Sequence, residues 1–241
     1  MRAAARIVAE ADGRGGTRLT VLHGESPLLP RRTGGWDDDA GVTVHLVGGA
    51  AGPLRGDDLR LHVTVGADAH LTVRGVAAQL ALPGRPDLPA SRLDIRAEVG
   101  PRARLRWLPE PLIAAAGCDH DAVTHVEVAE TGHLLWREEL VCGRHDEPAG
   151  DVRLSTTIRY AGGTVYRHDL AVGPHAPGWD SAAVLGPGRA LGTLVAVPGL
   201  DDPPMGTPTA AIMPLAGPAA LATAVGPDIR DVRAVLDKLA R

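Results

Sequence analysis

Hydrophobic and polar residues alternate along most of this chain, up to about residue 200. Over 58–65, aliphatic side chains occupy positions 59, 61, 63 and 65, and the residues between them are polar. A period of two is the signature of a β-strand with one buried and one exposed face. The same pattern recurs at 93–99, 123–128, 154–160 and 165–170. The chain is therefore predicted to be mainly β.

Three of the turns between these stretches resemble one another. The segments are VGADAHL at 65–71, VGPRARL at 99–105 and, more loosely, VAETGHL at 128–134. Repeated strand–turn–strand units favour sheets stacked along one axis, a β-solenoid-like arrangement. The alternative is a protein rich in hairpins, in which short turns recur by chance.

The C-terminal third has a different pattern. Residues 198–218 are rich in Pro and Gly and show little periodicity, and 218–225 is Ala-rich. The final stretch, 227–241, predicts a short amphipathic helix with one apolar face, made by Ile229, Val232, Leu236 and Leu239. No linker divides the chain, so we expect one domain over 1–241, with a helical appendage at its C-terminal end.

Composition narrows the possible functions. Apolar residues make up 44% but aromatic residues only 2%, so the core must consist of Val, Leu, Ala and Ile. A net charge of -4 argues against a nucleic-acid partner. No signal-peptide core or run of 18 apolar residues occurs, so we expect a cytoplasmic protein that makes no membrane contact.

Familiar catalytic signatures are absent from the sequence. It contains no phosphate-binding G-x-x-x-x-G-K-[ST] loop and no G-x-S-x-G nucleophile elbow. The segment Gly186-Pro187-Gly188 begins like a dinucleotide-binding fingerprint, but its next glycine comes one position late. We therefore expect no tightly bound cofactor.

The densest group of potential metal ligands is Cys118-Asp119-His120-Asp121, which we expect to lie in a turn. Thiolate, imidazole and carboxylate together could hold nickel or zinc, and Cys118 and His120 are the candidate ligands. Cys-x-His by itself is a weak signal. The strand histidines His62, His70 and His125 fall on polar faces, where solvation is the simpler interpretation.

Two carboxylates, Asp57 and Glu138, could have either a structural or a functional role. Asp57 closes a glycine-rich turn, where aspartate commonly caps backbone amides, although it could also line the rim of a pocket. Glu138 shares a strand face with Trp136 and would point inward if Trp136 is buried. A buried carboxylate needs a partner, and Arg144 could form a buried ion pair with it.

Three sequence blocks, in this order, resemble the urease accessory protein UreD (UreH) family. The first is the glycine turn with Gly48, Gly49, Gly56 and Asp57. The second is LRWLPEPLI at 105–113, with Trp107 and Pro109. The third is LLWREELVCGR at 134–144, with Glu138, Gly143 and Arg144. The chain departs from the family at 73–79, VRGVAAQ, where a Thr-Thr-Gln-Ala-Ala-Thr-Lys run is usual, and Gly150-Asp151 replaces the usual Gly-Glu.

The resemblance implies a non-enzymatic scaffold that acts with UreF and the GTPase UreG on apo-urease and supports delivery of nickel. A passage through such proteins is thought to carry the metal, and Asp57 would then be a candidate transit ligand. Nickel would be present only in transit. The alternatives are a metal-dependent enzyme on a β-sandwich or cupin-like fold and a carbohydrate- or protein-binding module. The scarcity of aromatic faces disfavours sugar binding.

Overall fold

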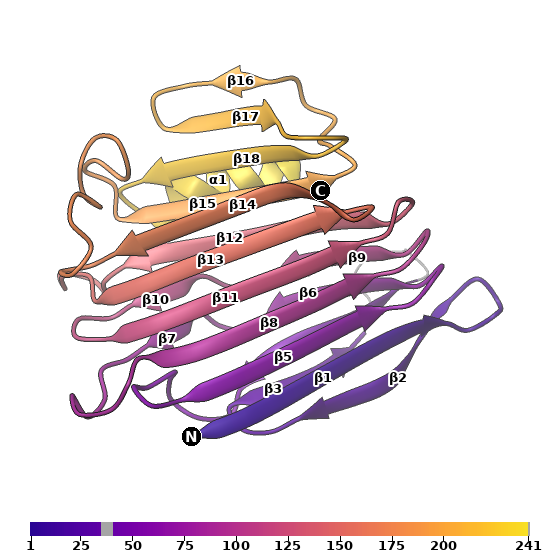
Figure 1. Ribbon diagram of the computed structural model, residues 1–241, viewed down its shortest axis with the longest axis horizontal. Coiled ribbons are helices and arrows are strands. Elements are labelled where there is room, and N and C mark those ends of the chain that lie inside the picture. The colour runs from indigo at the N-terminus through magenta and orange to yellow at the C-terminus, as the bar shows by residue number, and fades with distance from the viewer. Residues whose placement is uncertain (35–40, 241) are drawn as a thin grey trace.

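The computed structural model describes residues 1–34 and 41–240 as two facing β-sheets with one helix (Figure 1). Sheet A contains, in spatial order, β14 (Gly163–Val172), β13 (Asp151–Tyr160), β11 (Asp119–Val128), β8 (Ser91–Val99), β5 (Asp58–Val65), β1 (Arg2–Ala11) and β2 (Thr17–Gly24). Sheet B contains β16 (Met205–Gly206), β17 (Ala210–Pro214), β18 (Ala220–Gly226), β15 (Ala190–Val197), β12 (His133–Cys142), β9 (Arg104–Leu108), β6 (His70–Gly75), β4 (Val42–Gly48) and β3 (Leu28–Thr33). Two short strands complete sheet B, β7 (Gln79–Ala81) and β10 (Leu112–Ala114).

The chain winds between the two sheets. It runs from β5 in sheet A to β6 in sheet B, returns to β8, crosses to β9, and repeats the circuit through β11, β12 and β13. Each circuit adds a parallel neighbour, so β1, β5, β8, β11 and β13 are parallel in sheet A. In sheet B, β4, β6, β9 and β12 are likewise parallel. The prediction of a β-solenoid-like fold is confirmed.

The three similar turns are the crossings between the sheets. Each carries the chain from a strand of sheet A to one of sheet B, so none of them closes a hairpin. They stack through equivalent hydrogen bonds, in which Gly100 N donates to Val65 O at 2.8 Å and Ala129 N donates to Val99 O at 2.8 Å. Asp68 and Arg102 occupy the left-handed region at equivalent points, with φ of 60° and 55°. The hairpin alternative is therefore wrong for these turns.

The inward faces of the two sheets form the main core. Aliphatic residues dominate it, and its largest side chain is Trp136, which is 1% exposed. The Trp136 ring stacks on Trp107 from the neighbouring strand, with centroids 4.7 Å apart and planes 7° apart. Burial of each large aliphatic side chain stabilises the fold by about 1.5–3 kcal/mol, so alternation of the strands holds the two layers together.

The C-terminal strands are antiparallel and carry the helix. β15, β18 and β17 extend sheet B from β12. Helix α1 (Ile229–Leu239) packs on β15 and β18 through Val232 and Leu236, which confirms the predicted helix and its apolar face. Gly192 permits the close approach, since a Cβ there would lie 2.6 Å from both side chains. The strands β17 and β18 were not predicted, because alanine and proline are depleted in strands.

Candidate functional site

A cavity of about 540 Å³ lies between the two sheets. Inward residues of β5, β8 and β11 line one side, and the other side includes Trp107, Pro109 and Glu138. The exposed residues Ala51, Val76 and Ala77 also line it, so the cavity opens to the surface beside the glycine turn at 48–52. Most of the lining is apolar. Polar side chains on its long strands are therefore the candidates for function, namely His120, Thr124, Glu138 and Glu139. Glu139 is already paired with Arg233 at 2.7 Å, which leaves the other three.

His120 presents an unpartnered ring nitrogen inside the protein. Its side chain is 0% exposed, and Nδ1 lies 2.9 Å from Ser91 Oγ. The same Ser91 Oγ lies 3.2 Å from Asp119 O. Nε2 has no hydrogen-bond partner among the described residues. Burial lowers the pKa of His120 to about 4, which keeps the imidazole neutral at neutral pH.

Glu138 points inward together with Trp136, as the strand alternation predicts. Its Oε1 accepts hydrogen bonds from Trp136 Nε1 at 3.1 Å and from Thr156 Oγ1 at 2.8 Å. Over residues 1–34 and 41–240, no cation is paired with this carboxylate. Arg144 instead pairs with Glu147 at 2.7 Å, on the surface. The expected buried ion pair between Glu138 and Arg144 is therefore wrong, because Arg144 follows the end of β12 and turns away from the core.

The polar groups follow one another along the cavity. Thr156 of β13 lies beside Thr124 of β11 in the parallel register, and Thr156 binds Glu138. His120 is four residues before Thr124 on the same face of β11, a separation of about 13 Å at the rise of a strand. The carboxylate of Glu138 therefore bonds at the level of Thr124, and His120 lies one further stretch along the strand.

Asp57 caps its own turn. The side chain is buried, Oδ2 accepts from Leu54 N at 2.9 Å, and Oδ1 accepts from the Met1 ammonium at 2.6 Å. The preceding Gly56 has φ of +83°, which the turn requires. Asp57 is outside the set of residues that line the cavity. The backbone-capping interpretation is therefore the one the contacts support, and a role in metal transit stays a prediction.

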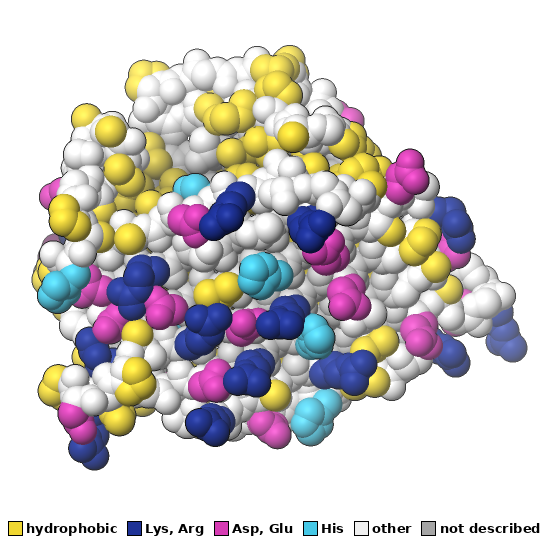
Figure 2. All heavy atoms as spheres, viewed as in Figure 1, with side chains coloured by type: hydrophobic (Ala, Val, Ile, Leu, Met, Phe, Trp, Pro, Cys, Tyr) yellow, Lys and Arg dark blue, Asp and Glu magenta, His cyan; other side chains and the backbone are white. Residues whose placement is uncertain are grey.

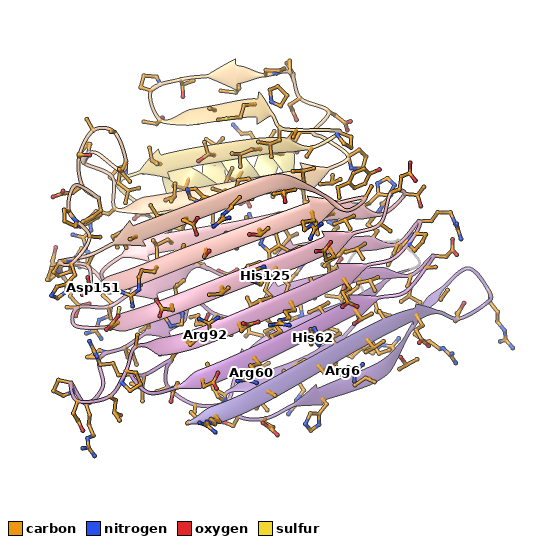
Figure 3. All side chains as sticks on the ribbon, in the orientation of Figure 1. Arg6, Arg60, His62, Arg92, His125 and Asp151 are labelled. Atoms are coloured by element: carbon orange, nitrogen blue, oxygen red, sulfur yellow. The ribbon has the colours of Figure 1, made fainter. Side chains whose placement is uncertain are left out.

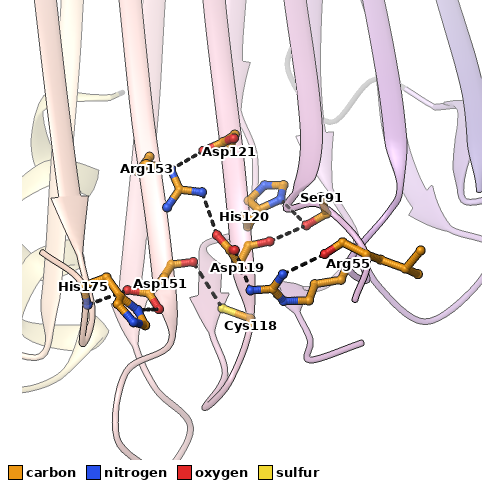
Figure 4. A network of polar contacts seen from close by, with 10 residues as sticks. Arg55, Ser91, Cys118, Asp119, His120, Asp121, Asp151, Arg153 and His175 are labelled. Carbon is orange, nitrogen blue, oxygen red and sulfur yellow. Dashed lines mark hydrogen bonds and ion pairs between the residues drawn. The ribbon is translucent and has the colours of Figure 1, made fainter. Parts of the chain in front are cut away.

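The cluster at 118–121 is divided between the two sides of sheet A (Figure 4). Cys118 closes the turn before β11, where its N donates to Ala115 O at 3.0 Å. Asp119, His120 and Asp121 lie at the start of β11 and not in a turn, so their side chains alternate. Asp119 pairs with Arg55 and Arg153, each at 2.6 Å, at the outer rim. Cys118 is buried, and desolvation raises its thiol pKa to about 12, which disfavours the thiolate that binds metals.

The remaining residues of the three sequence blocks fall into two groups. Gly48, Trp107, Pro109 and Glu138 line the cavity, although they are far apart in the chain. Gly49 and Gly143 shape turns: a Cβ at Gly143 would lie 2.3 Å from Glu147 O, and its φ is +84°. Sequence reasoning missed Thr124 and Thr156, which the alternation of 119–128 and 151–160 could have placed inward.

Comparison with known proteins identifies the family. The profile of the UreD urease accessory protein family matches residues 1–241. The chain is 47% identical to urease accessory protein UreD 3 of Streptomyces griseus, a match that covers 100% of this chain and 96% of that protein. It is 46% identical to urease accessory protein UreD of Streptomyces coelicolor, over 98% and 94% of the two chains. This chain belongs to the UreD family.

Membership of the UreD family confirms the resemblance and supports a role in urease maturation. The segment 73–79, which differs from the usual family sequence, lies in part at the cavity opening, where Val76, Ala77 and Ala78 line it. Apolar side chains therefore occupy this part of the opening. Over the described ranges, no helix combines the length and apolar character needed to cross a membrane.

Proposed function

We propose that this protein is the urease accessory scaffold that supports nickel insertion into apo-urease, in a complex with UreF and the GTPase UreG. In this proposal the cavity between the sheets forms part of the path of the metal. The full-length match to the UreD family supports the maturation role. The observation that carries the path is the unpartnered Nε2 of His120, which faces the same cavity as the carboxylate of Glu138.

The chemistry of these groups suits a divalent cargo ion. Imidazole nitrogen is a favourable ligand for Ni²⁺, and a carboxylate without a paired cation compensates its charge. A single ligand at each point holds an ion weakly enough for release, which a path requires. About 13 Å along β11 separates His120 from Thr124, and Glu138 is bonded to Thr156, the register neighbour of Thr124. Thr124 supplies a hydroxyl oxygen to the lining of the same cavity.

The test is activation of apo-urease by nickel in the presence of this protein, UreF and UreG. We expect the double variant His120→Gln and Glu138→Gln to co-purify with its partners but to deliver several-fold less nickel. Metal content and urease activity are both measured. Glu127→Gln is the matched control, since Glu127 is an exposed carboxylate on the outer face of β11.

The two parts of the proposal fail separately. Full activation by the double variant would overturn the cavity path but leave the scaffold role standing. Failure of the wild-type protein to associate with UreF and UreG would overturn the scaffold role.

A resident-metal enzyme makes a different prediction, namely about one tightly held metal ion per chain. The described residues contain no group of three His, Cys, Asp or Glu placed to hold a metal ion. Elemental analysis after dialysis against a chelator separates the two functions, because a transit protein retains far less than one ion.

A further inference from the structure

A row of basic side chains crosses the outer face of sheet A. In the strand register, Arg6 of β1 lies beside His62 of β5, and His62 lies beside Arg96 of β8. Arg96 lies beside His125 of β11. The row continues through Thr157 of β13 to Arg167 of β14. We call Arg6, His62, Arg96, His125 and Arg167 the basic row.

The basic row is exposed along its whole length. All five side chains are in the exposed class, and Figures 2 and 3 show basic and histidine side chains on this face of the sheet. Neighbouring strands lie about 4.8 Å apart, so the row from β1 to β14 extends about 24 Å. It carries three positive charges when the histidines are neutral and five when both are protonated.

Local ion pairs leave the row positive. Arg6 has no ion pair among the described residues. Arg96 contacts Asp94 at 3.1 Å, but the same carboxylate also contacts Arg92 at 3.3 Å. Arg167 contacts Asp169 at 3.5 Å, and both side chains are largely exposed. Exposed pairs of this kind contribute little, and like charges on adjacent strands repel, so folding alone gives no reason for the row.

The rows on either side differ in charge. One neighbouring row carries Asp94 and Asp169 with a single arginine, Arg60. The other carries Glu98 and Glu127 with a single arginine, Arg159. Rows on one face are about 7 Å apart along the strands. Each neighbouring row is therefore net negative, and the basic row has carboxylates on both sides. A duplex nucleic acid or a membrane surface would meet those carboxylates, whereas a narrow acidic segment would avoid them.

We propose that the basic row is a docking site for an acidic helical segment of a partner protein. Carboxylates one helical turn apart repeat every 5.4 Å, which is close to the strand spacing of about 4.8 Å. Successive carboxylates of a helix that lies across the strands can therefore face successive strands of the row. The same-side spacing of an extended chain, about 7 Å, matches it less well. This docking is independent of the proposed metal path, which runs on the opposite face of the sheet.

The test uses the full-length protein and a fluorescein-labelled helical peptide whose glutamates repeat at i, i+4 and i+7, followed by fluorescence anisotropy. Arg6→Ser with Arg96→Ser should weaken binding about tenfold, since each exposed charge pair contributes up to about 1 kcal/mol. Arg92→Gln is the matched control and should change affinity less than twofold. Arg92 is equally exposed on β8, but its row neighbours are Asp58 and Asp121.

Further binding measurements test which kind of ligand the basic row accepts. A peptide with glutamine for glutamate should bind at least tenfold more weakly. Unchanged binding by the double arginine variant, or equal weakening by Arg92→Gln, would overturn the basic row. Equal or tighter binding of a single-stranded oligonucleotide or an anionic vesicle through the same arginines would overturn a protein segment as the occupant.

Discussion

Two histidines on one strand show how differently the two faces of sheet A are used. His120 and His125 both belong to β11, but an odd spacing places them on opposite sides. His120 is 0% exposed, and burial lowers its pKa to about 4. His125 is exposed beside Arg96. The same residue type is a neutral ligand candidate on the inner face and a titratable surface group on the outer face.

On the inner face of sheet A, the behaviour of a polar side chain depends on its removal from water. On the outer face, it depends on the side chains beside it on neighbouring strands. On the inner face, each polar atom must find a specific partner, so the partnerless Nε2 of His120 is informative. On the outer face, water can form hydrogen bonds with the polar groups. The interactions of an exposed side chain are therefore set by its in-register neighbours on adjacent strands. Variants at paired inner and outer positions therefore test the contrast directly.

The largest contrast is expected at Leu59 and Arg60, adjacent residues of β5. Leu59 is 0% exposed, so Leu59→Ala should lower the free energy of unfolding by about 2–5 kcal/mol through lost burial and a new cavity. Arg60 is exposed, and Arg60→Ala should change it by less than about 0.5 kcal/mol. Urea unfolding of both variants measures this. Equal effects would contradict the assignment of faces.

The second contrast is the pH dependence of stability. The pKa of His120 is about 4 in the folded protein and near 6.5 when unfolded, so the unfolded state binds the proton more readily. Stability should therefore fall as the pH drops from about 6.5 to 4, by up to about 3 kcal/mol. The change in unfolding free energy over this window should shrink in His120→Gln and persist in His125→Gln. A window unaffected by His120→Gln would show that other groups cause the dependence.

The third contrast concerns carboxylates. Glu138→Ala removes the acceptor of Trp136 Nε1 and Thr156 Oγ1 and leaves both donors unsatisfied, at a cost of about 1–3 kcal/mol. Glu127→Ala on the outer face of β11 should cost less than about 0.5 kcal/mol. Denaturation midpoints report both values, and near-UV circular dichroism reports the environment of the tryptophan pair. An unchanged midpoint for Glu138→Ala would mean that water replaces the carboxylate.

The smallest contrast lies at the rim, where the two faces meet. Arg153 contacts Asp119 and Asp121 and is about half exposed. Arg153→Met should cost about 0.5–1 kcal/mol, since solvent screens the pairs. Arg159→Met, which removes a single exposed contact with Glu127 at 3.6 Å, should cost less. Comparison of the two thermal midpoints ranks the pairs, and the reverse order would refute the role of the rim network.

Sequence reasoning located the strands of the solenoid and the face of each side chain, but it failed where partners come from distant segments. It directed Glu138 inward correctly and chose the wrong partner, because Thr156 reaches it only through the packing of sheet A on sheet B. It grouped Cys118 to Asp121 as one cluster, although alternation within β11 places His120 on the opposite face from Asp119 and Asp121. The basic row could not be predicted from the sequence. Its successive members are 29 to 56 positions apart, and only the strand register brings them side by side.

The sequence by itself determined the period-two strands, the positions of the three similar turns, the C-terminal helix and the family, because these depend on local patterns and short ordered blocks. Tertiary structure decided that Trp107, Pro109 and Glu138 share a cavity and that Asp57 is bound within its own turn. It also decided the register that places Arg6, Arg96 and Arg167 in one row. Local periodicity fixes which way a side chain points, whereas its neighbours depend on how many residues each circuit of the solenoid contains.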